Sequence, residues 1–192
     1  MNDRSDPTSP IRNREFALNG INHLALVCSD MQRTVDFYTE VLGMPLVKTL
    51  ELPGGMGQHF FFGLGNGDSL AFFWFPDAPA ATPGLAAPRG LPGTGMLTSG
   101  VASMNHVAFD VPEDKMDEYR RRLLDKGLEV TEIANHDDSR RTISADMHEG
   151  VFMRSMYFFD PDGILLEFAC WSNAGKALAG NQRNDVLEPA VH

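Results

Sequence analysis

The chain has 192 residues, enough for one compact domain or two very small ones. Its hydrophobic fraction of 43% and charged fraction of 22% are typical of a globular protein and exclude a mostly disordered or collagen-like chain. With 16 Lys and Arg against 26 Asp and Glu, the net charge is −10, so nucleic acid and anionic membrane surfaces would repel the chain. We therefore expect neither as a partner.

The ends of the chain predict no membrane insertion. No run approaches the roughly 20 apolar residues of a transmembrane helix, and the polar residues 1–19 lack the apolar centre of a signal peptide. We therefore expect a cytoplasmic protein in which Cys28 and Cys170 are buried thiols. Residues 1–19 and 173–192 are expected to be loosely held tails.

The first module is expected over residues 20–76. Residues 21–27, Ile-Asn-His-Leu-Ala-Leu-Val, are typical of a buried strand. A helical pattern over 30–42 follows, with Ser29 as a plausible N-cap and Gly43 as the terminator. Three strand-like runs complete the order βαβββ: 44–51, 58–64 and 69–75.

The second module, residues 104–172, repeats this order after a linker, 77–103, that is rich in Pro and Gly. Its first strand, 104–109, shares Asn-His-(Leu/Val)-Ala with the first strand of module one. A helical pattern over 113–126 ends at Gly127, and three strand-like runs follow: 128–134, 151–159 and 164–171.

Each half is too small to be a confident independent folder. We therefore predict one α+β domain over residues 20–172. In it, two βαβββ modules in pseudo-two-fold tandem form curved mixed sheets around a metal-binding cleft.

Three side chains are candidate metal ligands. His23 and His106 occupy equivalent positions in the two repeated strands, so a pseudo-two-fold axis would bring both imidazoles to one cleft. Glu167 is the only charge in its apolar strand, where an unpaired carboxylate is costly to bury. A metal ion would compensate it, as would a buried cation such as Arg154. Two imidazoles and a carboxylate are the ligand set of non-haem Fe(II) oxygenases.

These features resemble the vicinal oxygen chelate superfamily, which includes glyoxalase I, bleomycin- and fosfomycin-resistance proteins and extradiol ring-cleaving dioxygenases. The resemblance covers about residues 21–172. It rests on the doubled βαβββ order, the paired Asn-His-x-Ala strands and Asp160-Pro-Asp-Gly-x-x-x-Glu167. It implies that His23, His106 and Glu167 hold a metal.

Members similar to glyoxalase I use a fourth ligand, a carboxylate in the last strand of the first half. Aligning that strand with the last strand of the second half sets Phe72 opposite Glu167. Phenylalanine cannot ligate, so the fourth position is expected to be vacant. A set of three ligands resembles the extradiol enzymes.

A second resemblance favours the same branch. The spacing of His148, Met156-Tyr157, the Asp160–Gly163 turn and Glu167 matches the extradiol signature, except at Asp146. It implies that Tyr157 and His148 donate hydrogen bonds near the substrate. The usual acid–base histidine of these enzymes is missing at its place. Asp68 is the nearest residue, and His59 is the alternative.

The resemblance thus implies an Fe(II)-dependent, extradiol-type dioxygenase that cleaves a small catecholic substrate with O2. Mn(II), Zn(II) and Ni(II) are alternative metals, and a homo-oligomer is an open alternative to a monomer. Two other functions remain open at this point. One is a metal-dependent lyase or isomerase of the same superfamily, and the other is a non-catalytic protein that sequesters an aromatic drug.

Overall fold

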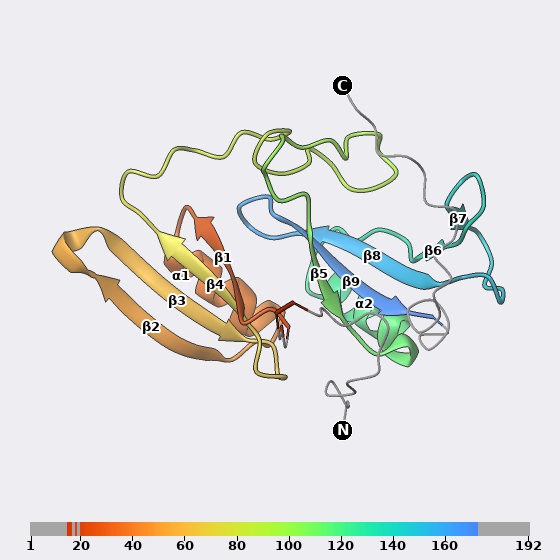
Figure 1. Cartoon of the computed structure of the whole chain (residues 1–192), viewed down its shortest axis with the longest axis horizontal. Coiled ribbons are helices and arrows are strands. Elements are labelled where there is room, and N and C mark those ends of the chain that lie inside the picture. The colour runs from red at the N-terminus through yellow and green to blue at the C-terminus, as the bar shows by residue number, and fades with distance from the viewer. Residues whose placement is uncertain (1–14, 17, 19, 173–192) are drawn as a thin grey trace.

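The computed structural model describes residues 15–16, 18 and 20–172, so most of the first expected tail and all of the second lie outside the described residues. The described chain forms two modules whose sheets lie side by side (Figure 1). Module one contains β1 (His23–Cys28), α1 (Met31–Asp36), a π-helical turn η1 (Phe37–Val41), β2 (Leu46–Leu52), a 3-10 turn η2 (Pro53–Gly55), β3 (Gly57–Gly63) and β4 (Ser69–Trp74).

Module two contains β5 (Val107–Asp110), a 3-10 turn η3 (Glu113–Lys115), α2 (Met116–Asp125), β6 (Ala134–His136), β7 (Ile143–Ser144), β8 (Met153–Phe159) and β9 (Leu165–Trp171). The α+β fold of two repeated modules is confirmed. The expected strand over 128–134 is wrong, since only Ala134 is in a strand. In this segment Thr131 exchanges hydrogen bonds with Tyr157 of β8. Its carbonyl, however, accepts a hydrogen bond from the Arg120 side chain rather than from a strand amide.

The two sheets have matching strand orders, β1-β4-β3-β2 and β5-β9-β8-β6-β7. In each, the first strand pairs in parallel with the last strand of its module and forms the edge of the sheet. β1 and β5 therefore flank the junction between the modules, and they point in opposite directions (Figure 1). This is the arrangement expected of a pseudo-two-fold axis at the junction.

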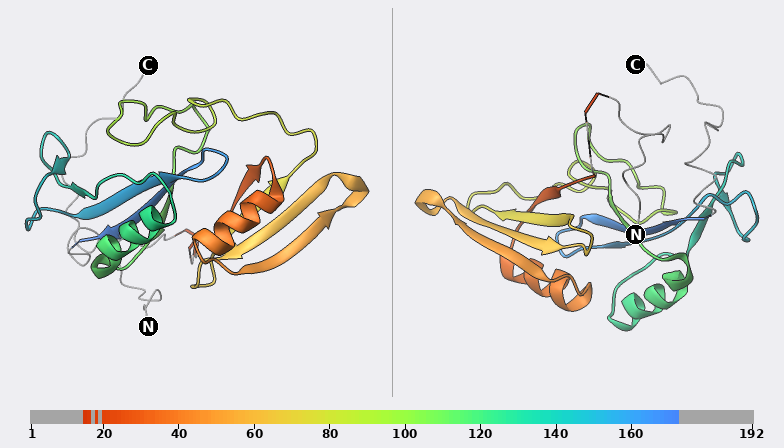
Figure 2. Two further views of the ribbon diagram at one scale, coloured as in Figure 1. Left: turned by 180° about the vertical axis from the view of Figure 1, so that it is seen from behind. Right: turned by 60° about the horizontal axis from the view of Figure 1, so that its bottom comes forward.

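Both helices cover the same side of the sheets (Figure 2). Leu24, Leu26 and Cys28 of β1 pack on that side, in a core that runs through both modules. The other side of the sheets is called the open face below. The open face carries His23, Val27, His59, Phe61, Ala71 and Phe73 in module one and His106, Ala108, His136, Met153, Ser155, Tyr157, Glu167 and Trp171 in module two. The two sheets are not closed around a common cleft within the chain.

The modules are joined through the β8–β9 turn. Ser29 and Arg33 donate hydrogen bonds to Asp162, each at 2.5 Å, and the buried hydroxyl of Tyr38 donates to Asp160 at 3.2 Å. Because Ser29 is engaged there, the N-cap of α1 is Asp30, whose side chain accepts a hydrogen bond from the Arg33 amide. The expected N-cap is therefore one residue too early.

The helix ends were predicted well. Gly43 and Gly127 have φ of 73° and 84°, a conformation that favours glycine just after a helix. Cys28 and Cys170 are buried free thiols, as expected. In the described part of the chain, no helix has the length and apolar character needed to cross a bilayer.

Candidate metal centre

His106 and Glu167 meet on the open face of module two. Nε2 of His106 lies 3.0 Å from Oε2 of Glu167, whose side chain is only 3% exposed. The other carboxylate oxygen, Oε1, is buried and has no hydrogen-bond partner among the described residues. Arg154, the alternative partner for Glu167, pairs with Cys170 in the sheet and faces the other way, toward Asn135. A buried oxygen without a donor fits a site for a cation.

The two partners shift each other's ionisation. The hydrogen bond to Glu167 raises the pKa of His106, against the effect of burial. Burial raises the pKa of Glu167, but the hydrogen bond from His106 and the nearby hydroxyls of Ser155 and Tyr157 outweigh it, so this pKa lies below its usual value. Glu167 is therefore a carboxylate at neutral pH, the form that binds a metal ion.

Asn105 orients the His106 ring. Nδ2 of Asn105 donates to the Leu97 carbonyl at 2.8 Å, so Oδ1 faces Nδ1 of His106 at 2.9 Å. An amide oxygen only accepts hydrogen bonds, so Nδ1 of His106 carries a proton. Nε2, which donates a proton to Glu167, is consequently the nitrogen that would bind a metal on losing that proton. Asn105 is the type of outer partner that fixes a metal-binding histidine.

The repeated Asn-His pair makes the same contact in module one. Nδ1 of His23 lies 2.8 Å from Oδ1 of Asn22, so Nε2 is again the nitrogen that would bind a metal. His23 is exposed on the open face, and its ring contacts Phe61 edge to face. The two repeats thus present their imidazoles in the same way.

His23 does not join the other two candidates within the chain. His23 begins β1 and His106 immediately precedes β5, so their opposite strand directions place them at opposite ends of the junction. No group of three or more His, Cys, Asp or Glu side chains in the described chain is close enough together to hold a metal ion. One chain therefore brings together two of the three proposed ligands.

The residue of module one that is equivalent to Glu167 is Ala71, and the assignment of Phe72 to this position is wrong. Ala25 pairs with Ala71 in module one as Ala108 pairs with Glu167 in module two. Phe72 faces the helices, where it is fully buried against Tyr38. A register error of one residue moves a side chain to the other face of a sheet.

Tyr157 lies directly across the ladder from Glu167. Its ring contacts His106 edge to face, with 6.0 Å between centroids, and packs under Leu91 of the linker. Burial, together with the charge of Glu167, raises the pKa of Tyr157 to about 12. The phenol therefore keeps its proton at neutral pH and can act as a hydrogen-bond donor.

His148 is held in a loop contact. Its Nδ1 accepts a hydrogen bond from the Gly150 amide, and its Nε2 lies 3.2 Å from Oδ2 of Asp137. Ser139 donates to the other oxygen of Asp137. Both ring nitrogens of His148 are thus engaged within the 137–150 loop.

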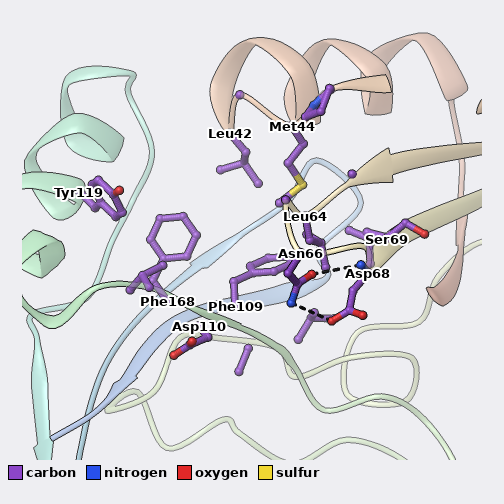
Figure 3. Close-up of a pocket in the computed structure, with 18 of the residues that line it drawn as sticks. Leu42, Met44, Leu64, Asn66, Asp68, Ser69, Phe109, Asp110, Tyr119 and Phe168 are labelled. Atoms are coloured by element: carbon purple, nitrogen blue, oxygen red, sulfur yellow. Dashed lines mark hydrogen bonds between the residues drawn. The ribbon is translucent and has the colours of Figure 1, made fainter. Parts of the chain in front are cut away.

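Asp68 lies in a separate cavity of about 980 Å³ between the modules (Figure 3). Apolar side chains such as Leu42, Leu64 and Phe109 form much of its wall. Asn66 and Asp68 bond each other in the turn before β4, at 3.0 and 3.1 Å. Neither His106 nor Glu167 lines this cavity, so the structure separates Asp68 from them.

His59 lies on the open face, like His23. Its ring stacks on Phe73 with 3.6 Å between centroids, and its Nε2 is buried without a partner among the described residues. Burial lowers the pKa of His59, and His23 adds to this effect. A neutral imidazole at neutral pH can accept a proton.

Sequence reasoning missed Ser155 and His136. Both lie on the open face with Glu167, and Ser155 Oγ and His136 Nε2 are buried without hydrogen-bond partners in the described chain. The signal for Ser155 was present, because residues two apart in a strand share a face and Ser155 precedes Tyr157 by two.

Comparisons with known proteins agree with this fold. The family model described as the Glyoxalase/Bleomycin resistance protein/Dioxygenase superfamily matches residues 20–168. The putative ring-cleaving dioxygenase MhqE of Bacillus subtilis is 32% identical over 117 residues, covering 59% of this chain. The chain spans only about a third (33%) of the length of MhqE.

Two further relatives are matched over most of their length. The metallothiol transferase FosB of Shouchella clausii is 28% identical over 150 residues, which is 78% of this chain and 79% of FosB. The solved structure of a glyoxalase family protein from Enterococcus faecalis is 25% identical, with a TM-score of 0.53, and the match covers 78% of this chain and 96% of that one.

Proposed function

The chain belongs to the Glyoxalase/Bleomycin resistance protein/Dioxygenase superfamily, and we propose that it is a metal-dependent, extradiol-type dioxygenase that opens a catecholic ring with O2. The observation that carries the proposal is the buried, partnerless Oε1 of Glu167 beside His106. It fits a bound divalent cation, because an anionic oxygen without a donor is unfavourable in a protein interior.

His23, His106 and Glu167 are the proposed ligands, with Fe(II) as the preferred metal and Mn(II) as the alternative. When bound, the metal would supply sites for adjacent substrate oxygens and for O2. Ala71 cannot ligate, so it leaves open the position that a fourth carboxylate would fill. That vacancy supports a reaction in which substrate chelates the metal.

The third ligand is proposed to come from a second copy of the chain. His23 is separated from His106 and Glu167 within one chain, while all three lie on the open face. A two-fold axis between copies would set module one of each against module two of the other, giving two identical sites. Val27 and Leu50, which are 51% and 40% exposed, would lie in this contact.

The chain's own groups have distinct proposed roles. Tyr157 would donate a hydrogen bond to a substrate oxygen that gains negative charge, an interaction that helps most in the transition state. His59 would hold the substrate proton, because its Nε2 lacks a partner among the described residues and faces the side that carries His23. This assigns His59, rather than Asp68 in the inter-module cavity, as the acid–base group.

A second candidate is a metal-dependent transfer or lyase reaction of the same superfamily. The coverage of FosB favours it, since the match spans 79% of FosB and only 33% of MhqE. The same three ligands would then bind an oxygen of a different substrate.

The test is to purify the full chain without oxygen, measure its metal content, and record oxygen uptake with a panel of catechols. Iron with ring-cleavage uptake supports the dioxygenase. Zinc, nickel or manganese without uptake supports the transfer or lyase reaction. A protein that binds no metal overturns both and leaves sequestration of an aromatic compound.

A further inference from the structure

The cavity between the modules takes no part in the proposed metal centre. Its volume of about 980 Å³ is that of a site for a small organic molecule. Both modules contribute side chains to its walls (Figure 3): Leu42, Met44, Leu64 and Asp68 from module one, and Phe109, Asp110, Tyr119 and Phe168 from module two.

The wall from module two is aromatic. Phe168 of β9 contacts Phe109 of β5 and Tyr119 of α2 edge to face, with 6.2 and 6.1 Å between the ring centroids. Arg122 already places its guanidinium carbon 5.7 Å from the centroid of Tyr119. All three rings are half-buried, so each keeps surface that a ligand can contact. Aromatic faces attract cations through the ring quadrupole.

The positive charges at the cavity are bonded to other protein groups. Nζ of Lys126 donates hydrogen bonds to the carbonyls of Glu40 and Val41, at 2.8 and 2.5 Å. The guanidinium of Arg122 pairs with the carboxylate of Glu118. Neither cation therefore neutralises a carboxylate that lines the cavity.

The two carboxylates of the lining have no cationic partner. Asp68 accepts a hydrogen bond from Asn66 at 3.0 Å, and Asp110 is exposed at the end of β5. Within the described chain, no Lys, Arg or His forms an ion pair with either carboxylate. The cavity thus combines two unneutralised carboxylates, one from each module, with an aromatic and aliphatic surface. This combination is complementary to an organic cation.

We propose that the inter-module cavity binds an organic cation, a molecule that joins a quaternary or protonated amine to apolar or aromatic groups. The positive charge lies near Asp68 and Asp110, and the apolar part packs against the aromatic wall and the side chains of Leu42 and Leu64. This site is separate from the metal centre and does not depend on the proposed function. The same carboxylates repel an anion of equal size and shape.

Tetraphenylphosphonium and tetraphenylborate test the preference for a cation, because they have nearly the same size and apolar surface but opposite charge. Their Kd values for the full chain are measured by equilibrium dialysis in sodium buffer. Tetraphenylphosphonium should bind at least about tenfold more tightly than tetraphenylborate, and added salt should weaken its binding. Equal binding of the two probes, tighter binding of the borate, or binding of neither overturns the proposal.

Substitutions show whether the cation binds in the cavity. Asp68→Asn and Asp110→Asn should each raise the Kd of tetraphenylphosphonium about threefold to tenfold, the scale of one lost charge interaction near the surface. Asp114→Asn removes the same charge from η3, which does not line the cavity, and should change the Kd less than about twofold. Phe109→Leu keeps an apolar side chain without the ring and should raise the Kd about threefold.

Circular dichroism shows which variants are folded, and the two Asp variants decide the result if Phe109→Leu is not. An equal loss of affinity in Asp114→Asn would mean that the net charge of the protein attracts the cation, and the cavity site would be wrong. Unchanged affinity in both Asp68→Asn and Asp110→Asn would place the cation elsewhere and overturn the proposal too.

Discussion

Ala71 occupies in module one the position that Glu167 occupies in module two. Ala71 pairs in parallel with Ala25, and Glu167 pairs in parallel with Ala108. Each of these two alanines lies two residues after the histidine of its repeat, His23 or His106. The duplicated framework is thus present twice, but the carboxylate only once. At the proposed metal centre, this asymmetry leaves three protein ligands instead of four.

Ala71→Glu should therefore add a fourth protein ligand beside His23. We expect tighter metal binding and a loss of turnover, because the new carboxylate takes a position that substrate needs. The measurements are metal affinity by competition with a chelator and the rate of oxygen uptake.

Two variants control for this change. Ala71→Gln has a similar size without the charge and should leave metal affinity near the wild-type value. Phe72→Glu places a carboxylate against Tyr38 in the core and should destabilise the fold without affecting the metal directly. Unchanged affinity in a folded Ala71→Glu protein would contradict the placement of Ala71 at the metal.

The error at Phe72 shows where sequence reasoning reached its limit. The repeated Asn-His strands, the helices and their glycine stops identified both modules and the family. The face on which Phe72 lies depends on which residue of β4 pairs with β1, and a shift of one residue reverses it. The turns before the two last strands are equally long, five residues each (64–68 and 160–164), and setting Ser69 against Ile164 instead of Leu165 produced the shift of one residue.

The contacts of His148 and the location of His23 depend on tertiary structure. His148 matched a family spacing, but its two nitrogens bond Asp137 and Gly150 because of the loop's own conformation. The separation of His23 from His106 follows from how the modules pack, and the repeat is compatible with pairing either within a chain or between chains. Local pattern predicts elements better than it predicts such packing.

Mixing two inactive variants tests whether the centre forms between copies. His23→Ala and Glu167→Ala each destroy every site in their own homodimer. If each site combines ligands from two chains, a mixed dimer restores one site of two, and random exchange should recover about a quarter of wild-type metal and activity. Sites built within one chain would recover nothing after unfolding and refolding the mixture.

Asn105→Ala should weaken metal binding through the orientation of His106. Loss of the Oδ1 contact frees the ring to rotate and to change tautomer, and partners of this type are worth roughly 10- to 100-fold in metal affinity. Asn22→Ala makes the matched change at His23 and should have a similar effect. If both variants bind metal as tightly as wild type, the Asn-His pairs are structural only.

Tyr157→Phe keeps the ring under Leu91 and removes only the hydroxyl. Metal content should not change, whereas turnover should fall by roughly 10²–10³, the scale for one preorganised donor. With a pKa of about 12, the phenol should also cause no change in activity between pH 6 and 9.

Tyr119→Phe is the control, because Tyr119 lies on the helix side against Phe168, and this variant should turn over normally. Full activity in metal-loaded Tyr157→Phe would remove the tyrosine from the mechanism.

Asp160 should make the protein less stable as the pH rises. Its carboxylate is buried in the β8–β9 turn, where Oδ1 accepts the amides of Asp162 and Ile164 and Oδ2 accepts the Tyr38 hydroxyl. Burial raises the pKa of Asp160 to about 6, from an ordinary value of 3.8. The folded state therefore holds this proton more tightly than the unfolded state, and the stability it contributes is full below pH 3.8 and lost as the pH rises through 6.

Asp160→Asn isolates this effect, because an amide keeps an acceptor for both backbone amides and has no proton to lose. Between pH 5 and 7.5 wild type should lose about 1 kcal/mol of unfolding free energy relative to the Asn variant, from the shift of about two pKa units. Urea unfolding of both proteins at several pH values measures this difference. Asp68→Asn removes the same charge from the β3–β4 turn and controls for the change in net charge. A difference between wild type and Asp160→Asn that stays constant over this range would mean that Asp160 ionises in the folded protein as readily as in the unfolded chain, and that its burial against Tyr38 has no energetic consequence.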